Sequence, residues 1–220
     1  FTSCDTLSGL QTAGGVGGGP VTQSEAGEGI RQALSQGITK AILGLNKQDG
    51  FFGNQAYKLF LPEEARKAEQ TLRDLGMGAQ VDKAILQINR AAEDAVGFAQ
   101  PIFVNAIKQM TITDALNIVK GSDTAATAYF RSKTRSQLLD AFRPSVQSSL
   151  DKVEATRYYG DVVNLYNRIP TVKKIDPDLT SFVVNKATDA LFDQIAKEES
   201  NIRANPLART TDILKRVFGR

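Results

Sequence analysis

Apolar side chains recur at intervals of three and four residues along most of the chain that follows residue 21. The first such segment runs from Thr22 or Ser24 to Asn46, and its apolar positions form one stripe. The stripe consists of Ile30, Leu34, Ile38, Ala41, Ile42 and Leu45. This spacing places side chains on a single face of an α-helix. We therefore predict a helix here, with its apolar face packed into a core.

The same periodicity predicts further helices, separated by glycine and proline. Five of them are expected over Pro62 to Gly76, Ala79 to Val96, Ile102 to Gln109, Tyr158 to Tyr166 and Leu207 to Phe218. Three more are expected to begin at a capping residue: one capped by Thr113 that ends before Gly121, one capped by Ser122 or Asp123 that continues past Phe142, and one that starts at Asp178 or Thr180 and ends at about Ala204. Pro144 is expected to kink its helix, because proline lacks a backbone N–H. No segment alternates like a strand for more than a few residues. The predicted fold class is therefore all-α, a single-domain multi-helix bundle over residues 22–220.

Residues 1–21 differ in composition from the rest of the chain. The stretch from Gly9 to Pro20 contains six glycines and few apolar side chains. Such a stretch cannot offset the entropy lost on ordering. We therefore expect a flexible tether, with an average span of roughly 20–25 Å.

Cys4 stands directly before this tether, and it follows the small residues Thr2 and Ser3. The segment resembles the end of a bacterial lipoprotein signal, in which the cysteine is lipidated after cleavage, although Phe1 replaces the usual leucine. This interpretation predicts a protein of the bacterial cell envelope, periplasmic or in the outer membrane, anchored to a membrane through a lipidated Cys4. The alternative is a buried or incidental cysteine, since cysteine is ordinarily a core residue.

Composition excludes several classes of chemistry. The chain has no histidine and one cysteine, which removes Ser-His-Asp catalysis, histidine-ligated zinc and multi-cysteine metal sites. We expect no metal and no cofactor. The net charge of +3 is small, and the basic residues are spread along the chain, so nucleic acid is not an expected partner.

Several short motifs occur in an order that resembles the bacterial "domain of unknown function 4197" family. They are Lys47-Gln48-Asp49-Gly50-Phe51, Leu61-Pro62, Leu75-Gly76-Met77-Gly78, Asn89-Arg90-Ala91-Ala92-Glu93, Ile107-Lys108-Gln109-Met110-Thr111, Asp123-Thr124-Ala125-Ala126-Thr127 and Glu198-Glu199-Ser200-Asn201-Ile202-Arg203-Ala204-Asn205-Pro206. The resemblance implies an exported or lipid-anchored protein of mainly helical fold. It implies no activity.

Glu198 interrupts the apolar stripe of the late helix, between Ile195 and Ile202. A buried carboxylate needs a cation or several hydrogen-bond donors, and we expect Arg90, with Asn89, to supply them.

Two interpretations of the surrounding polar residues stay open. In one, a pocket in which carboxylates face arginines binds a small ligand or performs acid-base chemistry. In the other, which we favour, the same residues form a structural ion-pair network. The candidate residues are Asn89, Arg90, Glu93, Glu198, Glu199 and Arg203. No catalytic residue is assigned.

The favoured function is a noncatalytic, membrane-tethered helical domain that binds a small ligand or an envelope protein. The alternative is an envelope hydrolase that uses a polar pocket of glutamate and arginine. The two differ in whether the carboxylates converge on an open cleft or are sealed within the helix packing.

Overall fold

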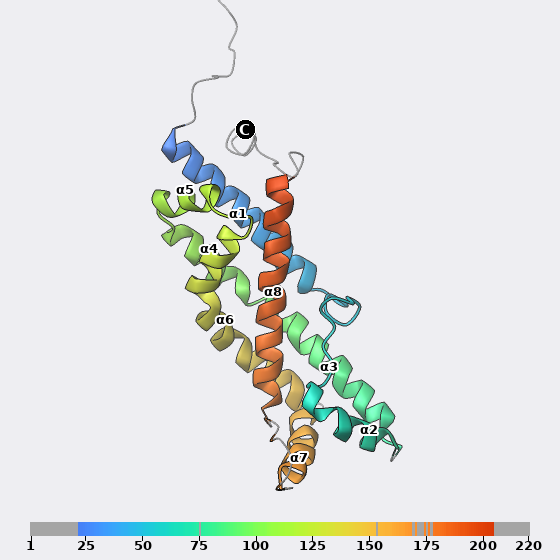
Figure 1. Ribbon diagram of the computed structural model, residues 1–220. Coiled ribbons are helices and arrows are strands. Elements are labelled where there is room, and N and C mark those ends of the chain that lie inside the picture. Colours follow the sequence, from blue (N-terminus) through green and yellow to red (C-terminus); the bar gives the residue numbers. More distant parts are fainter. Residues whose placement is uncertain are drawn as a thin grey trace, which may run out of the picture.

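The computed structural model describes residues 22–74, 76–152, 154–168, 170, 174, 176 and 178–204 (Figure 1). Within these ranges the chain forms α-helices and one short 3-10 helix, η1, and no strand. The elements are α1 (Gln23–Leu45), η1 (Glu63–Ala65), α2 (Arg66–Asp74), α3 (Gly78–Val96), α4 (Ala99–Gln109), α5 (Ile112–Lys120), α6 (Ala125–Asp151), α7 (Ala155–Asn167) and α8 (Leu179–Ala204). The all-α prediction is confirmed.

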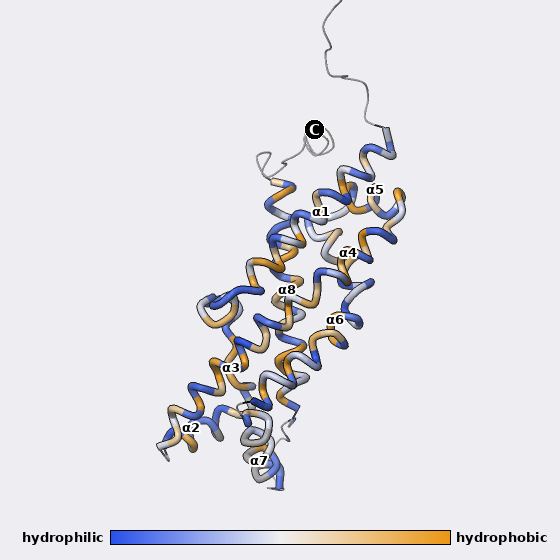
Figure 2. Tube along the Cα trace, turned by 180° about the vertical axis from the view of Figure 1, so that it is seen from behind, coloured by the Kyte–Doolittle hydropathy of each residue, from blue (hydrophilic) through white to orange (hydrophobic). Residues whose placement is uncertain are grey.

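The helices form an elongated bundle in which α8 runs along most of the length (Figure 1). It packs against α1, α3 and α6. The start of α1 lies at one end of the bundle with α4 and α5, and α2 and α7 lie at the other. Figure 2 shows apolar and polar positions interleaved along the long helices, as expected where one face of each helix is buried.

The core is a continuous cluster of apolar side chains, with buried residues from α1, α3, α4, α5, α6, α7 and α8. Phe103 on α4 lies at its centre, with its ring edge-on to Phe130 on α6 and to Phe192 on α8. The ring centroids are 5.7 and 6.1 Å apart, respectively, within the range that favours edge-to-face aromatic pairs. All three rings are fully buried. These contacts join helices that are distant in the sequence.

Two helix starts differ from the sequence prediction. α5 is capped by Thr111, and not by Thr113, because Thr111 and Asp114 form a reciprocal capping box. α6 begins after Thr124, and its side chain makes no capping hydrogen bond. The expected caps at Ser122 or Asp123 are therefore wrong. The first N–H groups of α6 are instead bonded by a side chain from another helix, described below. α1 begins at Gln23, consistent with the predicted start at Thr22 or Ser24, and Thr22 caps it through a capping box with Glu25.

Two of the helices contain a proline. α6 continues through Pro144 as one element from Ala125 to Asp151. α4 begins at Ala99, before Pro101, and not at Ile102. Pro101 is the third residue of that helix, where the missing N–H has no intrahelical partner to lose.

Cys4, the glycine-rich segment and the predicted helix from Leu207 to Phe218 lie outside the described residues. Among the residues that are described, no helix is long and apolar enough to cross a membrane.

Candidate functional site

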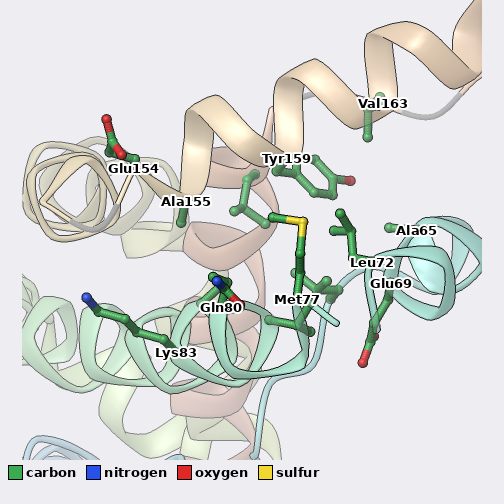
Figure 3. Close-up of a pocket in the computed structure, with 14 residues that line it drawn as sticks. Ala65, Glu69, Leu72, Met77, Gln80, Lys83, Glu154, Ala155, Tyr159 and Val163 are labelled. Atoms are coloured by element: carbon green, nitrogen blue, oxygen red, sulfur yellow. The ribbon is translucent and has the colours of Figure 1, made fainter. Parts of the chain in front are cut away.

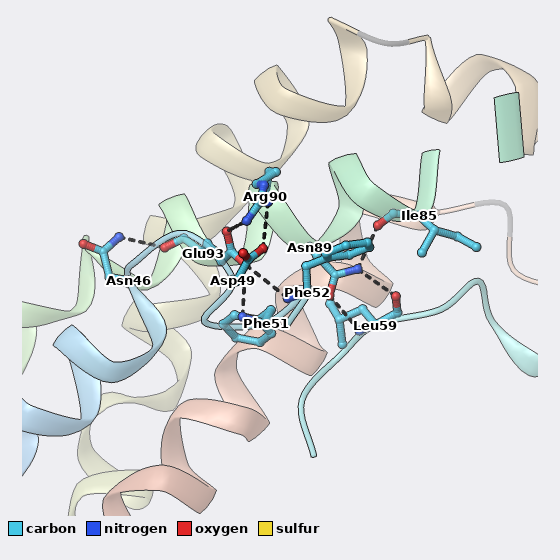
Figure 4. Close-up of polar contacts among 9 residues, drawn as sticks. All are labelled: Asn46, Asp49, Phe51, Phe52, Leu59, Ile85, Asn89, Arg90 and Glu93. Atoms are coloured by element: carbon cyan, nitrogen blue, oxygen red, sulfur yellow. Dashed lines mark hydrogen bonds and ion pairs between the residues drawn. The ribbon is translucent and has the colours of Figure 1, made fainter. Parts of the chain in front are cut away.

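The six polar residues singled out from the sequence lie in two separate places. Asn89, Arg90 and Glu93 are on α3, where they face the irregular segment 46–61 between α1 and η1 (Figure 4). Glu198, Glu199 and Arg203 are on the last turns of α8. The structure therefore does not bring them together into one polar pocket.

Glu93 is buried, with 3% of its surface exposed, and it holds the start of segment 46–61. One carboxylate oxygen accepts the backbone N–H groups of Phe51 and Phe52 at 3.0 and 3.1 Å. The other accepts a hydrogen bond from Arg90 at 2.6 Å. Both oxygens of this carboxylate are therefore engaged by the protein itself.

Asn89 holds the far end of the same segment. Its side-chain oxygen accepts the N–H of Leu59, and its amide donates to the carbonyls of Leu59 and Ile85, each at 2.8 Å. Asn46 adds a bond from its side-chain amide to the carbonyl of Glu93 at 2.7 Å. We call residues 46–61 the anchored loop, because buried polar groups of α3 satisfy its backbone at both ends.

Arg90 joins the anchored loop to Glu93. Its second terminal nitrogen donates a hydrogen bond to Asp49 at 2.8 Å. The hydrogen bond to Glu93, and to a smaller extent the one to Asp49, raises the pKa of Arg90. Asp49 has a φ of 65°, in the left-handed region that non-glycine residues rarely adopt. The ion pair with Arg90 helps to hold the turn in that conformation.

Glu199 supplies the missing cap of α6. Its buried carboxylate accepts the N–H groups of Ala126 and Thr127 at 3.0 and 2.9 Å, and the Thr127 hydroxyl at 2.8 Å. Arg203 bonds Glu199 at 2.8 Å and the carbonyl of Ile118, near the end of α5, at 2.8 Å. Glu199 and Arg203 together therefore satisfy backbone N–H groups at the start of α6 and a backbone carbonyl near the end of α5.

Glu198 is buried, and its partner is Lys40 on α1 at 2.7 Å. The expected pairing with Arg90 is wrong, because Arg90 is engaged by Glu93 and Asp49. α8 approaches α1 closely at Gly37, where an added Cβ would lie 3.2 Å from Ile202 and 3.7 Å from Glu198. This close approach brings Glu198 to α1.

A mostly apolar pocket that is open to solvent lies elsewhere, between α2, α3 and α7, at the end of the bundle opposite the start of α1 (Figures 1 and 3). It has a volume of about 340 Å³. Its apolar lining consists of Leu61, Ala65, Leu72, Met77, Val81, Ala84, Ala155, Tyr159, Val163 and Leu179. Figure 3 shows Met77 extending from the start of α3 toward Tyr159 on α7. We call this space the apolar pocket.

Four polar side chains complete the lining: Glu69, Gln80, Lys83 and Glu154. Lys83 and Glu154 lie at one end of the apolar pocket and Glu69 at the other (Figure 3). Glu69 is paired with Arg73 at 2.9 Å. Lys83 has no ion pair within the described part of the chain. The pocket is thus an apolar chamber with a lysine and a glutamate at one end.

No residue of this pocket was singled out as a binding residue from the sequence. The apolar residues come from five separate stretches of the chain, and each stretch fits the pattern of an amphipathic helix or a connector. No local motif marks a cavity, because a cavity results from how helices fail to fill the space between them.

Comparison with known proteins gives one match. Residues 20–219 match the model of a protein family described as "Protein of unknown function (DUF4197)". No curated protein and no solved structure matches the chain. The match agrees with the resemblance found in the motifs between Lys47 and Pro206.

Proposed function

Because the chain belongs to the DUF4197 family of proteins of unknown function, we propose a function from its own structure: a noncatalytic helical domain that binds a single-chain amphiphile in the apolar pocket. The observation that carries this proposal is the pocket itself, which is lined by ten apolar residues and reaches solvent. Small-molecule sites in proteins are concave and mostly apolar, with a few polar groups that fix the orientation of the ligand.

The volume sets the size of the ligand. A cavity of about 150 Å³ holds a benzene molecule, and a water molecule occupies about 30 Å³ of liquid. The 340 Å³ of the apolar pocket therefore accommodate roughly ten groups the size of a water molecule, such as the methylene units of a medium-length alkyl chain. The proposed ligand has an apolar chain of about this length.

The charges at the pocket set the position of the head group. Glu69 is paired with Arg73, which also pairs with Asp82, whereas Lys83 is exposed and has no ion pair within the described residues. An acidic head group would gain a charge-assisted hydrogen bond from Lys83 at that end of the pocket. A medium-chain carboxylate satisfies both requirements.

The hydrolase alternative finds no support in the polar residues. General acid-base chemistry needs a carboxylate within hydrogen-bond reach of a substrate. Glu93 and Glu199 instead direct their oxygens at backbone N–H groups and arginines. None of the six candidate polar residues lines the apolar pocket.

The binding proposal is tested with a fluorescent fatty acid, dansyl-undecanoate, and by competition with decanoate. Ala84→Phe places a ring in the pocket, and we expect it to weaken binding by about tenfold or more, a loss of about 1.4 kcal/mol. Ala128→Phe is the matched control, because Ala128 is exposed on α6 and outside the pocket. Equal binding by the parent and Ala84→Phe would contradict the proposal.

The proposal includes attachment to a membrane through a lipidated Cys4, supported by the Thr2-Ser3-Cys4 boundary and the glycines that follow. The domain would then act in the bacterial cell envelope. Mass spectrometry of the protein from a membrane fraction tests this: a lipid adduct is expected on Cys4, and Cys4→Ser is expected to release the protein into the soluble fraction. An unmodified Cys4 in the membrane-free fraction would exclude the anchor.

A further inference from the structure

A second concave surface lies beside the anchored loop, between residues 56–66 and the first half of α8. Phe60 and Lys58 line it from the loop, and Phe182 and Lys186 line it from α8. Leu61 lines both this surface and the apolar pocket, so the two are neighbours with different openings. We call this surface the α8 groove.

The carboxylates of the α8 groove are all neutralised by neighbouring cations. Glu63 pairs with Arg66 at 3.0 Å, and Asp189 pairs with Arg135 at 2.9 Å. Asp193 pairs with Lys197 at 2.8 Å. Hydrogen bonds from Lys197 and from Tyr57 lower the pKa of Asp193, so it stays ionised within these contacts.

Two lysines of the α8 groove lack such a partner within the described residues. The ammonium of Lys58 lies 4.1 Å from the centre of the Phe52 ring and 5.6 Å from that of Phe60. The ammonium of Lys186 lies 5.8 Å from the centre of the Phe182 ring. An aromatic face positions a cation without cancelling its charge or using its N–H donors in conventional hydrogen bonds. The groove therefore carries an uncompensated positive charge on two held ammonium groups.

The aromatic rings of the α8 groove add an apolar contact. Phe60 is 58% exposed, which is unusual for a large apolar side chain. Phe182 is half-buried on the opposite side of the groove. Aromatic rings are enriched at sites that bind another chain, and a bias toward one charge selects a partner of the opposite charge.

The anchored loop is built to hold these side chains in place. Glu93 fixes the backbone beside Phe52, and Asn89 fixes Leu59, which lies between Lys58 and Phe60. Burying a glutamate and an asparagine to satisfy an irregular loop is costly unless each polar group is bonded, as it is here. A preorganised loop loses less entropy when it binds a partner.

We propose that the α8 groove binds an acidic segment of a polypeptide, in which carboxylates meet Lys58 and Lys186 and an apolar side chain lies against Phe60 and Phe182. The charge of the groove selects the acidic partner. Its concave form favours an extended chain over a flat membrane surface, because side chains on both walls contact a chain that lies between them. This interaction is separate from ligand binding in the apolar pocket.

Fluorescence anisotropy with labelled peptides of about eight residues tests the proposal. The probe combines glutamate and phenylalanine, and two control peptides replace glutamate by lysine or phenylalanine by serine. We expect the parent domain to bind the glutamate-phenylalanine peptide most tightly, and to bind it more weakly as salt rises from about 50 to 500 mM. The double variant Lys58→Gln/Lys186→Gln should lose about tenfold in affinity, and Phe60→Ala should lose severalfold.

Lys108→Gln/Lys120→Gln is the matched control, since both lysines are exposed on α4 and α5, away from the groove. This control should bind the acidic peptide within about twofold of the parent, which is a difference of about 0.4 kcal/mol. All four substituted side chains and Phe60 are partly or fully exposed, and thermal unfolding verifies that each variant is folded.

Three outcomes would overturn the proposal: equal affinity for the glutamate and lysine peptides, an equal loss in the two double variants, or no change in Phe60→Ala. A fourth is binding to phosphatidylglycerol vesicles that depends on Lys58 and Lys186 while the acidic peptide does not bind, which would assign the groove to a membrane surface.

The Ala84→Phe variant retains the groove, so we expect it to bind the peptide normally. Failure of one proposal is thereby distinguished from failure of the other.

Discussion

At the scale of single residues, Glu198 and Glu199 show how neighbouring carboxylates acquire different roles. Both are buried on α8. Glu198 meets Lys40, whose side chain is 64% exposed, so water screens the pair. Glu199 meets two backbone N–H groups, a hydroxyl and Arg203, in a buried position. The contribution of each carboxylate to stability therefore depends on its partners more than on its burial.

We predict that Glu199→Ala lowers the free energy of unfolding by about 3 kcal/mol or more, because it leaves the donors of Ala126 and Thr127 unsatisfied and removes the carboxylate that pairs with Arg203. Glu198→Ala should cost only about 0.5–1 kcal/mol. Urea denaturation of the two variants measures both values. Similar losses in the two variants would contradict this assignment of roles.

At the scale of elements, the turn that begins the anchored loop depends on close backbone packing. Gly50 is buried, and a Cβ added there would lie 2.2 Å from the carbonyl oxygen of Leu45, at the end of α1. A backbone atom at the end of a helix cannot move aside as a flexible side chain does. Any side chain at position 50 therefore displaces the turn that Glu93 and Arg90 hold.

We predict that Gly50→Ala destabilises the protein by about 2–3 kcal/mol through this overlap. Its matched control is Gly44→Ala, because an added Cβ at Gly44 has nothing within 4 Å. Gly44 lies in α1, where alanine is the better helix former, so this change should stabilise by about 0.5 kcal/mol. Differential scanning calorimetry should show opposite shifts in Tm, and a Gly50→Ala variant that melts with the parent would exclude the close packing.

The capping box of α5 makes a prediction about pH. Hydrogen bonds from the Thr111 side chain, and then from its backbone N–H, lower the pKa of Asp114. A lowered pKa in the folded state means that the unfolded state binds the proton more readily. The stabilisation is therefore complete above the unfolded pKa of about 4, and it is lost as pH falls through the folded pKa.

Thr111→Ala removes the capping oxygen and the hydroxyl donor to Asp114, and we expect it to cost about 1 kcal/mol at pH 7. The cost should shrink at about pH 2.5, because the protonated Asp114 no longer gains from the lost hydroxyl. Urea unfolding of parent and variant at both pH values measures the change. A cost that is the same at the two pH values would argue against a role for the Asp114 charge.

At the scale of the whole molecule, the arrangement of helices separates two ends. The start of α1 and the end of α8 lie at one end of the bundle, and the apolar pocket lies at the other (Figure 1). With the proposed anchor at Cys4, the pocket would be the part of the domain farthest from the membrane. α8 connects the ends, since Leu179 lines the pocket and Glu199 caps α6.

Ligand binding should therefore raise the free energy of unfolding of the whole domain, but slow amide exchange only in the helices around the pocket. At a free decanoate concentration about 100 times its Kd, we expect a gain of about 2.7 kcal/mol and a rise in Tm of about 5–10 °C. Amide exchange should slow in α2, the first turns of α3 and α7, and stay unchanged in α5. Protection spread evenly over all helices, or confined to α5, would contradict binding in the apolar pocket.

The sequence by itself determined where most of the described helices lie, because local periodicity and the residues that end a helix encode them. The boundaries of α3 and α8 follow the predicted ranges closely, and Asp178 bonds the N–H of Ser181 at the start of α8, as predicted. The family was also visible in the sequence, because its motifs occur in order along the chain.

Only the tertiary structure decided which polar groups meet and where space is left open. The caps of α6 come from Glu199, which is more than 70 residues away, and Glu198 meets Lys40 because α8 approaches α1 at Gly37. The apolar pocket depends on the packing of α2, α3 and α7, which no single segment encodes. Helix formation is a local property of the chain, whereas long-range pairing and cavities depend on how all the helix faces fit together at once.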